Sequence, residues 1–291
     1  MISCLCGGNS SEEFERRNYT FFRCESCSLL FVSPRFNAES IYDESYFSGG
    51  AHGFGFSNYE IDKTASSRYL HQLLNWLLSE TVPANFKLLD VGAANGFFVE
   101  LCTKRGIDAI GIEISQDAVE WAARLGRKVT NSTLEKFSSA EKFTAITFLD
   151  VLEHIHNPIE FLAAASMNLE DNGFLLINVP NEGSLSAKLA GKNWHALLPP
   201  EHWFYFNKNS LKLLLENSGF EVIKMKSISK SFTLNYVYLT VLNSPQVPSL
   251  IRLILKYMKP IFSGVFGKAK IFLPLYDNLS VVAKKSNSLF I

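Results

Sequence analysis

The feature that most constrains the fold is a regular alternation of short apolar segments with amphipathic ones between residues 86 and 228. Apolar runs such as FKLLDV at 86–91 and IDAIGIEI at 107–114 have the length of buried strands, whereas SQDAVEWAARLG at 115–126 has helical periodicity. Strands that alternate with helices of this length form βαβ units, which build a parallel sheet with right-handed crossovers. The sequence therefore predicts an α/β fold with a doubly wound, mostly parallel sheet of seven strands.

Local signals mark the ends of these elements. Ser115 and Asn157 precede helical segments and are expected N-caps, because their side-chain oxygens can accept a hydrogen bond from the first turn. A helix is expected over 62–78, before the sheet, and a last strand over 278–285. The expected divisions are a cysteine-bearing module (1–35), a connector with the N-terminal helix (36–82), the ligand-binding core (83–229), and a C-terminal helical insertion with the final strand (230–291).

Composition excludes several classes of protein. Hydrophobic residues make up 47% and charged residues 19%, which is typical of a globular chain with a full core. The formal net charge is zero, so no global field attracts nucleic acid, and a small-molecule substrate is favoured. Because the N-terminus lacks a signal-peptide pattern and no apolar run approaches the roughly 18 residues that span a bilayer, we expect a cytoplasmic protein.

The first strand is followed by a glycine-rich turn, Asp90-Val-Gly92-Ala-Ala-Asn-Gly96. Ligands of open parallel sheets bind beyond the carboxyl ends of the strands, where glycines let a ligand approach the backbone. The next strand ends at Glu113, and an acid about 20 residues after such a loop can accept hydrogen bonds from ribose hydroxyls. Together these positions predict a nucleoside-containing ligand.

The form of the loop indicates which nucleoside is bound. A nicotinamide cofactor requires G-x-G-x-x-G around its pyrophosphate, whereas this loop is G-x-x-x-G and follows an acid, Asp90. S-adenosylmethionine has no phosphate, and its methionyl end carries an ammonium and a carboxylate. The sequence therefore favours S-adenosylmethionine as the cofactor.

The order LLDVGAANGFF, GIEIS, FLDVLEHIHNP, GFLLINVPN, PPEHWFYFNKNSL and ENSGFEV resembles the class I S-adenosylmethionine-dependent methyltransferases, in particular a bacterial branch with an N-terminal zinc-ribbon-like module. The resemblance covers about residues 1–230. It implies an enzyme that transfers a methyl group from S-adenosylmethionine to a small-molecule acceptor, with oxygen as the expected acceptor atom. A sugar of surface polysaccharide biosynthesis is the acceptor that the branch suggests, with a quinone or lipid-linked acceptor, or a non-catalytic nucleotide-binding module, as alternatives.

The resemblance also implies which residues surround the cofactor: Asp90, Gly92, Ala93, Ala94, Gly96, Glu113, Ile114, Ser132, Thr133, Asp150 and Leu152. The loop would hold the methionyl end, Glu113 the ribose, and Ile114 the adenine. Ser132 and Thr133 would border the base, and Asp150 and Leu152 the other side of the cofactor. Family members usually have glycine at the position of Ala94, so we expect Ala94 to keep a negative φ.

Two histidines are candidate catalytic bases. His154, in DVLEH, follows the fourth strand, and His202 lies among aromatic residues in PPEHWFYF. Methyl transfer requires aligned reactants and removal of a proton from the acceptor, and a histidine titrates near neutrality. A packed turn histidine and an exposed lid histidine are the respective alternatives. Asp150, Glu153 and His154 also resemble an acid-and-histidine cluster that quinone O-methyltransferases associate with a divalent ion.

The first 27 residues contain four of the five cysteines, Cys4, Cys6, Cys24 and Cys27. Two such thiolate pairs are typical of a four-cysteine structural zinc site, although the first pair has one intervening residue where two are usual. Packed thiols without metal and redox chemistry are the alternatives.

Residues 248–276 mix large apolar residues with Arg252, Lys256, Lys259, Lys268 and Lys270 and contain no acid. Pro260 is expected to divide this segment into two short helices. We expect the helices to pack on the sheet or at a homodimer contact; peripheral contact with the inner face of a membrane is the alternative.

Overall fold

The computed structural model describes residues 2–33, 60, 63–64, 67–80, 85–199, 201–243, 247–263, 269–272 and 275–286. Most of the expected connector at 36–82 and Lys268 lie outside the described residues. The helix expected over 62–78 is described as α3 (Ser67–Glu80).

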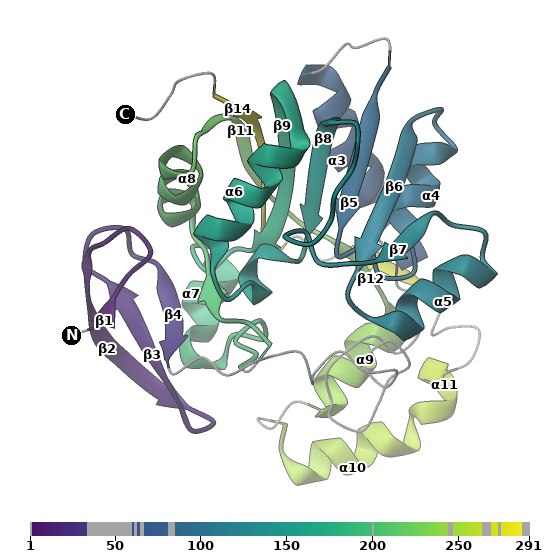
Figure 1. The fold of residues 1–291 in the computed structure, drawn as a ribbon. Coiled ribbons are helices and arrows are strands. Elements are labelled where there is room, and N and C mark those ends of the chain that lie inside the picture. The colour runs from purple at the N-terminus through teal and green to yellow at the C-terminus, as the bar shows by residue number, and fades with distance from the viewer. Residues whose placement is uncertain are drawn as a thin grey trace.

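The core is a seven-stranded sheet, as predicted. From one edge to the other its strands are β11 (Phe220–Ile228), β14 (Asn278–Lys285), β9 (Leu169–Pro180), β8 (Phe143–Leu149), β5 (Lys87–Val91), β6 (Asp108–Glu113) and β7 (Val129–Asn131). All neighbours from β9 to β7 pair in parallel, whereas β14 pairs antiparallel with both β9 and β11. The sheet is therefore doubly wound and mostly parallel. After β5 the chain adds β6 and β7 on one side of it, and then crosses over to add β8 and β9 on the other side (Figure 1).

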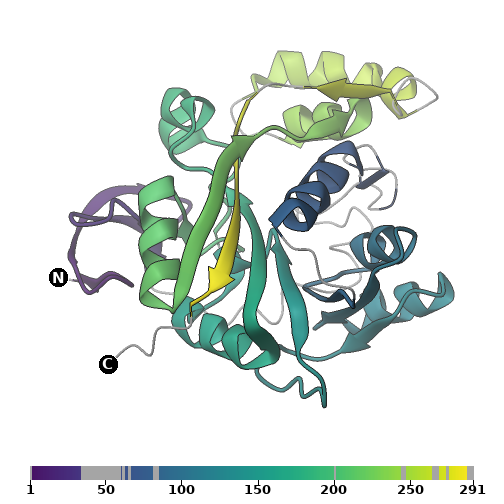
Figure 2. The ribbon, with the colours of Figure 1, turned by 90° about the horizontal axis from the view of Figure 1, so that it is seen from above.

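Helices cover both faces of this sheet (Figures 1 and 2). α3 and α4 (Phe97–Thr103) bury one face, α6 (Pro158–Asn168) and α8 (Lys208–Asn217) bury the other, and α5 (Gln116–Arg124) packs beside β6 and β7. The expected N-caps are confirmed: Ser115 Oγ accepts from the Ala118 amide at 3.4 Å, and Asn157 Oδ1 accepts from the Glu160 amide at 3.5 Å. These short polar residues end each loop by satisfying amides that the helix leaves without a partner.

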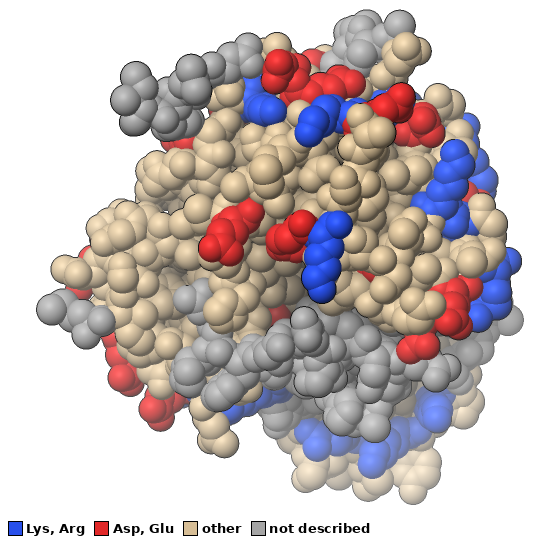
Figure 3. Space-filling view, viewed as in Figure 1, with Lys and Arg blue, Asp and Glu red and all other residues tan. Residues whose placement is uncertain are grey.

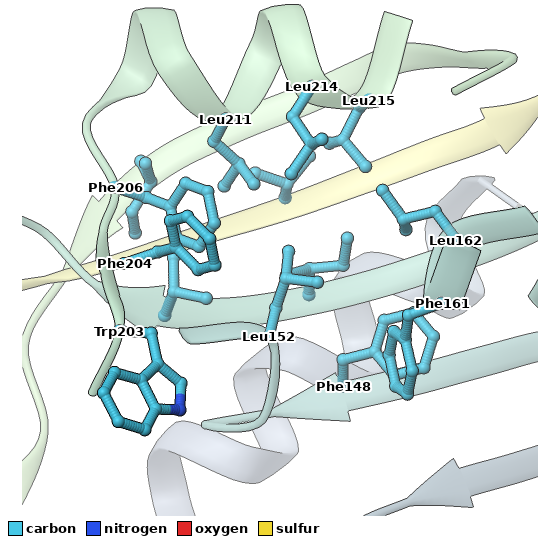
Figure 4. Close-up of a cluster of buried hydrophobic side chains, with 14 of the residues drawn as sticks. Phe148, Leu152, Phe161, Leu162, Trp203, Phe204, Phe206, Leu211, Leu214 and Leu215 are labelled. Carbon is cyan, nitrogen blue, oxygen red and sulfur yellow. The ribbon is translucent and has the colours of Figure 1, made fainter. Parts of the chain in front are cut away.

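The larger apolar cluster lies between the sheet, α6 and α8. Figure 4 shows Phe148 from β8 facing Phe161 and Leu162 of α6, with Phe204, Phe206 and the leucines of α8 beside them. Each such side chain contributes about 1.5–3 kcal/mol when it is removed from water. This cluster holds the end of β8 in place, and the segment that follows β8 carries the candidate catalytic residues.

The N-terminal module is continuous with the core. Its strands β1 (Ile2–Ser3), β2 (Asn9–Arg16), β3 (Tyr19–Cys24) and β4 (Leu30–Ser33) form an antiparallel sheet whose fifth strand is β10 (Phe204–Tyr205), from the core. Phe31 pairs with Phe204, and the Val32 amide donates to the Trp203 carbonyl at 3.1 Å. Arg23 extends this contact through an ion pair with Glu182 at 2.7 Å.

Two short elements lead from β9 to β10, namely α7 (Leu185–Ala190) and the single 3₁₀ turn η2 (Gly191–Asn193). Another 3₁₀ turn, η1 (Leu152–His154), follows β8. Both connections run along the carboxyl edge of the sheet, where ligands of this fold class bind.

The C-terminal insertion forms a lobe beyond that same edge (Figure 1). It consists of β12 (Ser231–Thr233), α9 (Leu234–Asn243), α10 (Ser249–Tyr257), α11 (Lys259–Ser263) and β13 (Lys270–Phe272). The break between α10 and α11 lies beside Pro260, as predicted. Of the two expected positions for these helices, packing on the sheet does not hold for α10, which contacts α9 and α11 and has no buried residue; a homodimer contact stays a prediction. None of the helices in the described part of the chain is long and apolar enough to cross a membrane.

Candidate functional site

The loop between β5 and α4 has a backbone that requires glycine at two positions. Gly92 has a φ of 69°, and a Cβ there would lie 2.6 Å from Val151 Cγ2. Gly96 has a φ of 73°, and its Cβ would lie 2.8 Å from Val129 Cγ2. Between them Ala94 has a φ of 48°, so the expectation of a negative φ is wrong. A left-handed alanine costs roughly 1–2 kcal/mol, so other contacts must hold the loop in this form.

Glu113 supplies those contacts from the end of β6. Its Oε2 accepts from the Ala94 amide at 2.8 Å, and its Oε1 accepts from the amides of Ile114 and Ser115 at 2.8 and 3.0 Å. Burial raises the pKa of Glu113, and these three amides oppose the rise. The carboxylate expected to bind ribose therefore also connects the end of β6 to the glycine-rich loop, a role that the sequence did not suggest.

Asp90 is buried at the tip of β5. Its Oδ1 accepts from the Thr147 hydroxyl at 2.5 Å, and burial raises its pKa to about 7. Ala93 is buried beside it in the same turn. A buried carboxyl with one neutral hydrogen-bond donor is poised to ionise when a cation arrives, which suits the ammonium of a methionyl group.

A second support of the loop was not predicted. Arg127, in the turn before β7, donates to the Asn95 carbonyl at 3.1 Å and pairs with Glu60 at 2.6 Å. Asn95 is completely buried, and its side-chain amide donates to Glu60 at 2.7 Å. These partners are 32 to 67 residues apart in sequence, so no local pattern reveals them.

The adenine-side residues lie around the end of β6. Ile114 exposes 48% of its surface, so an apolar ring could pack on it. Asn131 donates to the Ile114 carbonyl at 2.8 Å and holds the two strand ends together. The hydroxyls of Ser132 and Thr133 make local bonds: Ser132 donates to the Thr133 carbonyl at 2.9 Å, and Thr133 accepts from the Lys136 amide at 3.4 Å.

At the end of β8, Asp150 has a φ of 63° and pairs with Lys230, whose Nζ lies 2.8 and 2.7 Å from the two carboxylate oxygens. The Asn178 side chain donates to the same carboxylate at 2.5 Å. Burial alone would raise the pKa of Asp150, but the charges of Lys230 and Lys63 and the hydrogen bonds from Lys230 and Asn178 together outweigh burial and lower it. Lys230 follows β11 and lies over the Tyr69 ring, and sequence reasoning missed it. Leu152 was expected beside the cofactor, but its side chain is buried in the apolar cluster of Figure 4, which leaves only its backbone for a ligand.

The two candidate bases meet although they are 48 residues apart. The rings of His154 and His202 contact edge to face, with centroids 4.7 Å apart. His154 Nδ1 lies 2.9 Å from the Glu201 carbonyl, and His202 Nδ1 lies 2.9 Å from the Ala196 carbonyl. Because a carbonyl only accepts, each Nδ1 carries the hydrogen, and each neutral ring has its lone pair on Nε2. His202 is 8% exposed, so the exposed-lid alternative is wrong.

Burial affects every titratable group in this cluster. It lowers the pKa of His154 to about 4 and that of His202 well below the ordinary value. It raises the pKa of Glu153 well above the ordinary value, and Asp150 adds to the rise. Burial also raises the pKa of Glu201 to about 7, and sequence reasoning missed this carboxyl.

Glu153 is 1% exposed, and neither of its carboxylate oxygens has a hydrogen-bond partner among the described residues. Glu153, His154 and His202 offer one ligand atom each within 4.8 Å of one another, so they could share a proton or a divalent cation. A buried carboxyl without a partner is costly, and such groups are concentrated at sites that meet a ligand.

The four N-terminal cysteines also lie together. Cys4 Sγ is 3.6 Å from Cys27 Sγ, Cys6 Sγ is 3.5 Å from Cys24 Sγ, and all four lie within 4.8 Å of one another. The Gly7 amide donates to the Cys4 carbonyl, and the Ser28 amide donates to the Cys24 carbonyl, which gives one tight turn per pair. The shorter first pair therefore still directs both thiols to the same point.

The strand order, the glycine-rich loop and the acid at the end of the second strand define a class I methyltransferase fold. A family model described as a methyltransferase domain matches residues 60–225, which is more than half of the 291-residue chain. The protein belongs to this family and is an S-adenosylmethionine-dependent methyltransferase.

Curated relatives include ubiquinone biosynthesis O-methyltransferases from several bacteria. That of Azoarcus sp. strain BH72 is 22% identical over 58% of this chain and 80% of its own length. That of Histophilus somni strain 2336 is 30% identical over 39% of this chain and 50% of its own length. The chain thus spans between half and four fifths of these relatives.

Solved structures share the fold. A SAM-dependent methyltransferase from Archaeoglobus fulgidus has a TM-score of 0.51 and 20% identity, with 76% of this chain and 94% of that chain covered. The magnesium protoporphyrin IX methyltransferase of Synechocystis PCC 6803, solved with bound SAH, has a TM-score of 0.53 and 12% identity, with 86% of this chain and all of the other covered.

Proposed function

We propose that this enzyme methylates an acidic oxygen of a small acceptor, a phenol or quinol, in preference to an alcohol of a sugar. The observation that carries the proposal is the buried contact of His154 with His202 at the carboxyl edge of the sheet. Both rings have the tautomer of a base, because both Nδ1 atoms donate to carbonyls.

The strength of these bases favours an acidic acceptor. A histidine whose pKa is lowered to about 4 is a poor acceptor for the proton of a sugar hydroxyl. A phenol ionises near pH 10, as tyrosine does, and needs less help. The names of the relatives, ubiquinone biosynthesis O-methyltransferases, support the same class of acceptor.

In this mechanism His154 or His202 takes the acceptor's proton on Nε2, and the negative charge of Asp150, which acts to raise the pKa of both histidines, stabilises the resulting imidazolium. Lys230, which pairs with Asp150, orients an acceptor oxygen by charge. S-adenosylmethionine, when bound, supplies an electrophilic methyl group and leaves as a neutral thioether. The residues otherwise align the reactants and exclude water.

The test is release of S-adenosylhomocysteine with a catechol and with a sugar alcohol as acceptors. We expect turnover with the catechol. One of the variants His154→Ala and His202→Ala removes the base, and that variant should lose a factor of about 10² to 10⁴ in turnover while its cofactor affinity stays nearly unchanged. Wild-type turnover in both variants would refute a histidine base. Turnover with the sugar alone would refute the acidic acceptor.

We also propose that Cys4, Cys6, Cys24 and Cys27 hold one structural zinc ion. The 3.5 and 3.6 Å separations of the sulfurs support this, because the edge of a tetrahedral zinc–thiolate site is about 3.8 Å when Zn–S is about 2.3 Å. Four protein ligands leave no open position, so the ion would have no part in the chemistry. The cytoplasmic location and the homodimer stay predictions from the sequence.

A further inference from the structure

The outer helix of the C-terminal lobe presents apolar side chains to solvent. In α10, Leu250, Leu253, Ile254 and Tyr257 are 51% to 80% exposed, and Ile251 is 48% exposed. At 100° per residue these five positions fall within one side of the helix, whereas half-buried Arg252 and Leu255 face the other side. Ile261 of α11 is a further exposed apolar side chain of the lobe, at 53%. Helices of globular proteins bury such a stripe against other elements, whereas no described part of the chain covers this one.

The charge of the lobe is of one sign. The described segment 247–263 carries Arg252, Lys256 and Lys259 and no acidic residue, although the whole chain has a net charge of zero. In Figure 3 basic side chains are visible on this lobe, at the bottom of the view. An apolar helix face flanked by basic residues matches the surface of an anionic bilayer, which has acyl chains below acidic headgroups.

The lobe is attached at the active-site edge. Lys230, which pairs with Asp150, is followed directly by β12 and α9, so the base of the lobe adjoins the acceptor side of the site. Tyr238 of α9 connects this base to the outer helices: its hydroxyl donates to the Leu255 carbonyl at 2.9 Å and its ring stacks on Phe262 at 4.7 Å. A surface that docks on α10 would therefore lie on the same side of the molecule as the end of β8 (Figure 1).

We propose that α10 and α11 dock the enzyme on an anionic phospholipid surface, with Leu253 and Tyr257 in the headgroup boundary and Lys256 and Lys259 on the lipid phosphates. The site then faces the membrane, where an apolar acceptor would be concentrated. Membrane docking goes beyond the proposed methyl transfer, and the test of docking does not depend on whether that proposal is correct.

The experiment is sedimentation of the full chain with vesicles of phosphatidylcholine, with and without phosphatidylglycerol. We expect binding only when phosphatidylglycerol is present, and weaker binding at high salt. Since each basic residue near such a surface contributes about fivefold to partitioning, Lys256→Glu/Lys259→Glu should reduce binding by at least about 25-fold. Leu253→Ser/Tyr257→Ser, which removes exposed apolar groups, should also release the protein.

Matched controls separate docking from general effects. Met167→Ser removes an apolar side chain, 65% exposed, in the last turn of α6, and Lys142→Glu/Lys212→Glu changes the net charge equally outside the lobe. Both should bind vesicles as the wild type does, and all variants should release S-adenosylhomocysteine normally with a water-soluble catechol. Absence of binding to anionic vesicles, or equal binding by the lobe variants, would overturn the proposal. So would a wild-type dimer in solution that Leu253→Ser/Tyr257→Ser converts to monomer, because the face would then belong to a second copy.

Discussion

Replacing Glu113 by Gln tests whether this carboxylate organises the cofactor loop. The carboxylate accepts three backbone amides, from Ala94, Ile114 and Ser115. Glutamine has one carbonyl oxygen, which can keep the two bonds from Ile114 and Ser115. Its NH₂ group would then face the Ala94 amide, donor against donor, at a position that is 7% exposed.

The expected cost follows from that geometry. Losing one charge-assisted hydrogen bond and leaving a buried amide without a partner costs about 1.5–3 kcal/mol. If the loss appears as opening of the loop, affinity for S-adenosylmethionine falls by roughly 10- to 100-fold. The cofactor-free protein should also be less stable, by up to the same free energy. A carboxylate that only bound ribose would lower affinity without lowering that stability, so the two measurements separate the roles.

The assays are titration calorimetry with S-adenosylmethionine and denaturant unfolding of the cofactor-free protein. Glu120→Gln, on the exposed side of α5, is the matched control and should change neither quantity. Ala94→Gly in the Glu113→Gln protein should restore roughly 1 kcal/mol of stability, because glycine accepts a φ of 48° without strain. Unchanged affinity and stability in Glu113→Gln would refute the reasoning.

Two further predictions concern Asp90 and zinc. The folded pKa of Asp90 is about 7 against an ordinary 3.8, so the stability that its neutral form contributes is complete below pH 3.8 and is lost as the pH rises through 7. The ionised form attracts the cofactor's ammonium, so calorimetry should find affinity rising about tenfold from pH 6 to pH 8, and a flat profile in Asp90→Asn. Elemental analysis should find one zinc per chain and none in Cys24→Ser. Because β4 pairs with β10, metal loss should also lower turnover, and full turnover by the zinc-free protein would contradict this coupling.

The parts of the site that sequence could predict are those encoded locally. The strand–loop–helix pattern around Gly92 and the acid 21 positions later follow from the geometry of one βαβ unit, and the N-caps follow from single polar residues. The wrong sign of φ at Ala94 is instructive. A negative φ is the preference of an isolated alanine, whereas the conformation of Ala94 depends on a carboxylate from the neighbouring strand.

The contacts among the residues on the acceptor side could not be predicted from the sequence in the same way. Lys230 reaches Asp150 across 80 residues, and His202 reaches His154 across 48, because β11 and the segment before β10 both end at the carboxyl edge of the sheet. No periodic pattern encodes such contacts. The outward face of α10 was also out of reach, because a hydrophobic stripe in sequence does not reveal which side of a helix the rest of the chain covers.

The position of Trp203 explains how the N-terminal module and the candidate catalytic cluster depend on each other. Its carbonyl accepts from the Val32 amide of β4 at 3.1 Å, and its amide donates to the Glu153 carbonyl at 2.9 Å. One peptide segment thus connects the cysteine-bearing sheet to the turn that carries Glu153 and His154, with His202 as its preceding residue. Loosening β4 would release His202 and Glu153 together, and the unpartnered Glu153 carboxyl would gain a path to water. The module therefore supports the turn that carries the candidate bases, through a sheet that includes β10 from the core.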